Sequence, residues 1–270
     1  MKYKSSVLAA APLLAAALAA GAPAQAQMAS SGWQFEAAVY GWFPAIRGDI
    51  SFPDGGGSSI DMSTRDVLDA LKFAFFTALQ VRNGEWGLFT DIAYADLGDN
   101  GRINAHVDTG TVLGKVPVSL NADLDIKTWI WTIAGTYQLK NDNDGGMDLL
   151  FGARMLDMTN RLKWSNVSVI GIPIAASGTS EVNSTNWDAI VGLKGRAYLG
   201  EDRKWFVPYY ADIGTGESRL TYQVNAGVGY QFDWGAVVGS WRYLSYNFKS
   251  GSLIENQSFS GPLVGMVFKF

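Results

Sequence analysis

The chain has no cysteine and only one histidine, His106, among its 270 residues. Without cysteine it has neither disulfides nor thiolate metal sites. Serines are plentiful, but His106 lies in a polar stretch that we expect to be a solvated loop, and no G-x-S-x-G elbow or other nucleophile motif accompanies it. The sequence therefore predicts no catalytic residue, no cofactor and no metal site. A lipid-modifying enzyme built on carboxylates or on Ser and Tyr stays open as an alternative.

Clusters of basic residues are also missing. The chain carries 21 Lys and Arg against 25 Asp and Glu, a formal charge of −4. Nucleic-acid binding depends on basic contacts to phosphate. We therefore expect no nucleic-acid partner.

The amino terminus has the three-part layout of a secretory signal peptide. Lys2 and Lys4 precede an apolar run over residues 7–20, which is followed by the small-residue triplet Ala24-Gln25-Ala26. This predicts a cleaved signal peptide at 1–26 and one domain at 27–270. Loss of the two lysines would take the formal charge to −6.

No segment after residue 26 approaches the roughly 20 apolar residues of a membrane-spanning helix. Yet the chain is 13% aromatic, with 10 Trp and 31 Gly. An exported chain of this kind is either a soluble β-sandwich or an outer-membrane β-barrel, and both show period-two alternation. Short turns at one end, long connections at the other and aromatics at strand ends favour the barrel. The aromatics concerned are Trp86, Tyr137, Trp205, Tyr230, Phe232 and Trp234.

The alternation predicts about ten strands, and therefore an all-β fold: a closed antiparallel transmembrane β-barrel. The expected strands are 33–47, 73–82, 86–98, 118–139, 147–165, 184–200, 204–214, 219–232, 235–248 and 258–270. Short turns are expected at 82–85, 141–146, 200–204 and 232–235, and long connections at 49–72, 99–118, 166–184, 214–219 and 249–257.

The last strand also carries the expected route into the membrane. Val264, Met266, Phe268 and Phe270 share one apolar face. We expect this face to contact lipid, and the strand ending in Phe270 to be recognised by the barrel-insertion machinery. The predicted location is the outer membrane of a Gram-negative cell, with outer-membrane lipids as partners and the oligomeric state left open.

Two of the long connections also alternate and are expected to be hairpin arms above the bilayer. Their turns are predicted near Gly114-Lys115 and Gly171-Ile172-Pro173. The first long connection carries a helix signal, with Ser63 as N-cap, Asp66 three residues later, and an apolar face ending at Leu71. That helix is expected to cap the lumen, with a gate as the alternative.

Several runs resemble a family of small, mostly uncharacterised outer-membrane β-barrel proteins of proteobacteria. The runs are GEWGLFTDIAYADLG (84–98), LLFGARMLDM (149–158), NWDAIVGLKGRAYL (186–199), PYYADIGTGESRLTYQVNAGVGYQF (208–232) and WRYLSYNF (241–248). The resemblance implies the fold and the location. It carries over no catalytic residue.

Charged residues recur within strands on the face opposite the apolar one. Because charges are costly inside a membrane unless they are paired or face a polar interior, we expect them to line the lumen. They are Glu36, Asp91, Arg154, Asp188, Lys194, Arg196, Asp212, Arg242 and Lys269. We expect a ladder of ion pairs, with Asp188 and Asp212 near Lys194, Arg196 and Arg242.

A barrel of about ten strands is narrow enough for side chains to fill. The predicted function is accordingly an outer-membrane barrel with a polar, largely closed interior and a structural or surface-interaction role. The alternative is a narrow porin-like channel for small solutes, in which these charges form a selective constriction.

Overall fold

The computed structural model describes residues 32–51, 57–108, 115–169, 172–173, 177–249 and 254–270. The predicted signal peptide lies outside them. The described residues form thirteen strands and one helix: β1 (Trp33–Trp42), β2 (Ala45–Ser51), β3 (Gly57–Met62), α2 (Thr64–Ala70), β4 (Leu71–Asn83), β5 (Trp86–Asp108), β6 (Lys115–Asp142), β7 (Gly145–Val169), β8 (Ile172–Pro173), β9 (Gly178–Leu199), β10 (Trp205–Gly216), β11 (Ser218–Phe232), β12 (Gly235–Phe248) and β13 (Ile254–Lys269).

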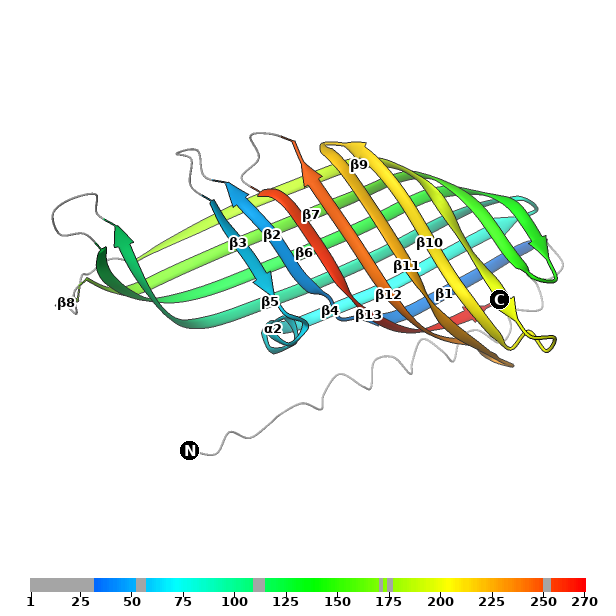
Figure 1. The fold of residues 1–270 in the computed structure, drawn as a ribbon, viewed down its shortest axis with the longest axis horizontal. Helices are drawn as coiled ribbons and strands as arrows, with labels where there is room; N and C mark the ends of the chain where they lie inside the picture. Colours follow the sequence, from blue (N-terminus) through cyan, green and yellow to red (C-terminus); the bar gives the residue numbers. More distant parts are fainter. Residues whose placement is uncertain (1–31, 52–56, 109–114, 170–171, 174–176, 250–253) are drawn as a thin grey trace, which may run out of the picture.

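Ten of the strands close into an antiparallel barrel, which confirms the predicted fold class (Figure 1). Their order is β1-β4-β5-β6-β7-β9-β10-β11-β12-β13. Pairing of β1 with β13, from Glu36↔Lys269 to Trp42↔Leu263, closes the ring. Closure leaves these strands without a free edge at this level of the barrel.

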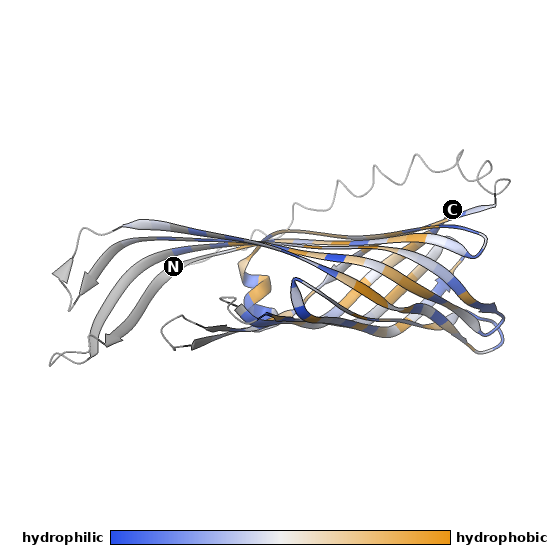
Figure 2. Ribbon diagram, turned by 90° about the horizontal axis from the view of Figure 1, so that it is seen from above, coloured by the Kyte–Doolittle hydropathy of each residue, from blue (hydrophilic) through white to orange (hydrophobic). Residues whose placement is uncertain are grey.

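One end of the barrel, here called the turn end, holds the four predicted short turns and Phe270. In the first, Gly84 takes the left-handed conformation (φ 60°) that a tight turn after Asn83 requires. At the other, hairpin end, β5, β6 and β7 have 23, 28 and 25 residues. Figure 1 shows these strands continuing beyond the rest of the ring, and Figure 2 shows that apolar residues gather along the barrel itself.

The expected hairpin arms are confirmed. β5 and β6 stay paired as far as Asp108↔Lys115, so Lys115 lies in a strand and the rest of that turn falls outside the described residues. Ile172 and Pro173 form the short strand β8 against the end of β7. His106, expected in a polar loop, lies instead in β5 opposite Pro117.

Two other connections differ from the prediction. The connection at 214–219 is tight, not long: β10 ends at Gly216, and Glu217 N–H bonds the Trp187 carbonyl at 3.0 Å. The predicted strand 33–47 breaks into β1 and β2 around Pro44, whose missing N–H cannot continue the ladder. β2 and β3 then form an extra hairpin, which takes in the end of the predicted strand and the first part of the expected loop 49–72.

The helix α2 fills a gap in the barrel wall at the hairpin end. Pairing of β1 with β4 stops at Val39↔Thr77, whereas β4 stays paired with β5 up to Leu71↔Leu97. α2 crosses this gap, contacting β2, β3 and β5, and buries Val67. The predicted capping box of Ser63 and Asp66 is present. The helix thus lies in the wall rather than over the lumen.

The outer surface between the two ends is apolar and bordered by two aromatic bands. The band at the turn end includes the ring pairs Trp86–Tyr137, Trp205–Tyr230, Phe232–Trp234 and Trp234–Phe268. The opposite band, here called the outer band, lies toward the hairpin end and includes Phe73–Tyr94, Tyr94–Trp129, Trp131–Trp187 and Tyr222–Tyr243. Such girdles mark the two interfaces of a membrane barrel.

The span between the bands matches a bilayer. On β12 it runs from Gly235 to Tyr243, nine residues, against the roughly 9–11 that a tilted strand needs. The side chains that point outward between the bands include Leu79, Leu88, Phe151, Val191, Val228 and Met266, each at least 44% exposed. We call this surface the lipid-facing belt. Among the described residues no helix is long and apolar enough to cross a membrane.

Candidate functional site in the barrel interior

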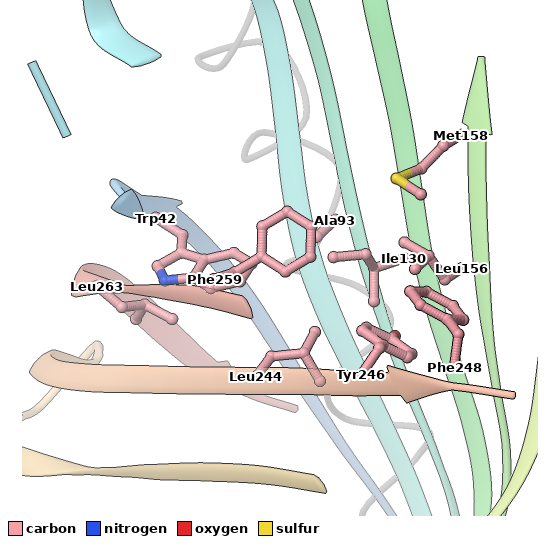
Figure 3. Close-up of a cluster of buried hydrophobic side chains, with 10 residues drawn as sticks. All are labelled: Trp42, Ala93, Ile130, Leu156, Met158, Leu244, Tyr246, Phe248, Phe259 and Leu263. Carbon is pink, nitrogen blue, oxygen red and sulfur yellow. The ribbon is translucent and has the colours of Figure 1, made fainter. Parts of the chain in front are cut away.

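The interior at the hairpin end is filled by apolar side chains (Figure 3). Leu156, Leu244 and Tyr246 have no exposed surface. We call this set the apolar plug; its members are Trp42, Ala93, Ile130, Leu156, Met158, Leu244, Tyr246, Phe248, Phe259 and Leu263. The expectation of a polar interior is therefore wrong for this half, because side chains shielded from both water and lipid pack as an ordinary core.

Next to the plug lies Arg154, the first of two buried arginines. Its guanidinium pairs with Asp212, with Nη1 donating to Oδ1 at 3.0 Å, and Nε donates to Thr132 Oγ1 at 3.1 Å. Both charged side chains are fully buried. A buried charge needs this dense pairing, since an unpaired one carries a large desolvation cost.

Arg242 is the second arginine and joins four strands. Nη2 donates to Asp91 Oδ1 at 3.0 Å and to Gln223 Oε1 at 2.8 Å. Nη1 donates to Tyr40 at 3.0 Å, and the guanidinium carbon lies 4.6 Å from the centre of the Trp42 ring. Arg242 therefore links the apolar plug to the charged half of the interior.

From this layer to the turn end the interior holds a cavity of about 460 Å³. Glu36 accepts a hydrogen bond from Arg196 Nη2 at 2.6 Å. Asp148 pairs with Arg82, and both side chains are about nine-tenths buried. Lys194 donates to Gln80 Oε1 and lies 4.0 Å from the centre of the Phe89 ring. Opposite charges from different strands thus face one another across the cavity.

All nine charges proposed from the sequence occupy inward positions, but their partners differ from the expected ones. Asp212 pairs with Arg154, and Arg242 with Asp91. Asp188 takes no cation in the described structure and accepts a hydrogen bond from Ser218 N at 2.8 Å. It stabilises the tight β10–β11 connection. Pairing across a barrel depends on the stagger of strands that are not neighbours, which alternation does not reveal.

Two cavity residues, Arg82 and Asp148, were missed because they lie beside predicted turns. Alternation still marks them: Arg82 continues the inward row of Ala78 and Gln80, and Asp148 precedes Leu150 by two positions. In the described part of the chain, no three His, Cys, Asp or Glu side chains are grouped to hold a metal ion.

No protein-family model and no curated protein matches the chain, so the family that the sequence runs resemble stays a prediction. Solved outer-membrane barrels do match. The outer membrane protease OmpT from Escherichia coli is 12% identical, with a TM-score of 0.49 over 88% of this chain and 97% of that one. The translocator domain of the autotransporter NalP from Neisseria meningitidis is 14% identical, with a TM-score of 0.38 over 97% and 100%. Ail, the attachment invasion locus protein of Yersinia pestis, is 12% identical, with a TM-score of 0.34 over 88% and 99%. The likeness concerns the barrel fold alone.

Proposed function

We propose that this protein is an integral barrel of the Gram-negative outer membrane that conducts no solute and presents its long hairpins at the cell surface. The observation that carries the proposal is the apolar plug, which fills the lumen at the hairpin end. A conducting pore needs a continuous aqueous path, whereas Leu156, Leu244 and Tyr246 are packed without exposed surface.

The hairpins support the surface role. Beyond Tyr94 in the outer aromatic band, β5 continues to Asp108, roughly 45 Å along the strand at about 3.3 Å per residue. This length exceeds what a bilayer span needs. These long strands extend from the end opposite Phe270, so we expect a partner outside the cell to be able to contact them. Insertion through β13, whose outward face is apolar, belongs to the same proposal.

Planar-bilayer recording tests the closed lumen. We expect no conductance steps from the purified protein. The variant Trp42→Ala/Leu244→Ala/Phe259→Ala removes three plug side chains and should conduct, which shows that the assay detects an open lumen. Steady steps from the unaltered protein that disappear in Arg196→Ala/Arg242→Ala would overturn the proposal in favour of the porin-like channel.

Cysteine labelling on intact cells tests the orientation, because the chain has no cysteine of its own. Ser165→Cys lies on the outward face of β7 above the outer band, and Asn143→Cys lies in an exposed turn at the turn end. A membrane-impermeant maleimide should label the first on intact cells and the second only after permeabilisation. The reverse pattern would contradict surface display.

A further inference from the structure

The cavity at the turn end carries more positive than negative side chains. Its lining contains five cationic and three acidic side chains: Arg82, Lys194, Arg196, Arg242 and Lys269 against Glu36, Asp91 and Asp148. Each carboxylate is engaged by an arginine. In the described structure, Lys194 and Lys269 form no salt bridge. The whole chain is acidic, so this excess is local to the cavity.

Lys194 is the more informative of the two lysines because it is partly buried. Its ammonium has three N–H donors; one reaches Gln80, and the group lies over the Phe89 ring. Glu36 interacts electrostatically with both lysines, but its carboxylate is held by Arg196 at 2.6 Å. Asp148, the cross-strand neighbour of Lys194, also interacts with it electrostatically, but that carboxylate is paired with Arg82. Glu36 and Asp148 are therefore shared among four cations: Arg82, Lys194, Arg196 and Lys269.

Three of the cavity residues also have a buried polar atom with no partner in the protein. They are Arg82 Nη1, Asn225 Oδ1 and Ser240 Oγ. Buried polar atoms are normally hydrogen-bonded to protein, water or a ligand. All three atoms lie in the cavity wall with almost no accessible surface, and Arg82 is already counted among the five cations.

We propose that this cavity binds a small organic anion with two carboxylate groups, which enters from the turn end. The volume of about 460 Å³ falls in the range of sites for small organic ligands, about 300–1,000 Å³. Two ammonium groups that form no salt bridge in the described structure, one partly buried on β9 and one exposed on β13, match two negative charges. Ligand binding here leaves the apolar plug closed and is independent of conduction.

Titration calorimetry with sodium succinate, on the detergent-solubilised protein at constant ionic strength, tests the proposal. We expect one binding site for succinate. Lys194→Met should lower its affinity about tenfold or more, equivalent to about 1.4 kcal/mol. The matched control is Lys204→Met, which removes the same charge from an exposed turn position at the same end and should leave affinity unchanged. Lys194→Arg retains the charge and should retain most of the binding.

Other outcomes would overturn the proposal. Absence of heat at about 10 mM succinate, or equal affinity in Lys194→Met and Lys204→Met, would exclude the site. Acetate binding as tightly as succinate would exclude the two-carboxylate ligand. Inorganic phosphate binding in place of succinate would exclude a carboxylate altogether. Retention of the heat-resistant folded form on electrophoresis would show that Lys194→Met still folds.

Discussion

The two halves of this barrel use opposite arrangements of the same alternating strands. Between the aromatic bands, outward side chains are apolar, and the inward ones include the cavity charges as well as a smaller buried apolar cluster. That cluster contains Phe89, Ala134, Leu150, Ile190 and Tyr210. Beyond the outer band the pattern reverses, as β7 shows: Leu156 and Met158 point inward, while Asp157, Thr159 and Arg161 point outward. On β12, Leu244 and Tyr246 likewise point inward, between Ser245 and Asn247.

The reversal follows from the solvent outside each half. Lipid favours apolar outward side chains, and water above the bilayer favours polar ones, so the interior there becomes the apolar core that a water-soluble barrel needs. The point on each strand where the pattern reverses therefore marks the surface of the bilayer at the hairpin end. It also explains why the lumen is closed at the hairpin end and hollow at the turn end.

The largest effect should come from breaking the buried ion pair between the two halves. Arg154→Met leaves Asp212 buried without its cation, which should lower the free energy of unfolding by about 3–5 kcal/mol. Urea unfolding in phospholipid vesicles, followed by tryptophan fluorescence, measures this. Arg154→Met/Asp212→Leu removes both charges and should recover most of the loss. A single variant as stable as the parent would mean that this layer is hydrated rather than dry.

A smaller effect should come from placing a positive charge on the lipid-facing belt, compared with the same change beyond the outer band. Val191→Arg puts a charge in the middle of the lipid-facing belt, where Val191 is 49% exposed, and should cost about 2–4 kcal/mol. Asn183→Arg makes the same change on the same face of β9, above the outer band, and should have little effect. The same unfolding assay compares them. Equal costs would place the boundary elsewhere.

Much of the barrel could be predicted from the sequence because lipid imposes one rule on every outward side chain. Val224 and Val228 on β11, and Val264 and Met266 on β13, follow that rule and lie outward. The capping box at Ser63 is equally local and was also predictable. The ring of ten strands follows from counting such segments.

The interior was only partly predictable because both charged side chains and an apolar core can fill a closed barrel. Leu156 and Tyr246 carry the reversed alternation, but a reversal is visible only once the membrane boundary on the strand is known. The partners of Arg154 and Arg242 lie on strands distant in sequence. The break at Pro44 was readable from its missing N–H, yet the filling of the resulting gap by α2 depends on packing.

The smallest effect should come from an ion pair with the same chemistry as the buried one, seven positions further along β7. Arg161 and Glu181 pair at 2.7 Å with both side chains well exposed, and hydrogen bonds from Arg161 and Asn183 lower the pKa of Glu181 below its ordinary 4.5. A lowered carboxyl pKa gives stability that is present above pH 4.5 and is lost as the pH falls through the folded-state pKa. Because water screens this pair, Glu181→Gln should leave the unfolding midpoint unchanged at pH 7, and parent and variant should remain indistinguishable at pH 4. A clear drop in the unfolding midpoint of Glu181→Gln at pH 7 would show that surface charges hold the hairpin arms together. It would also show that the membrane boundary does not separate strong ion pairs from weak ones.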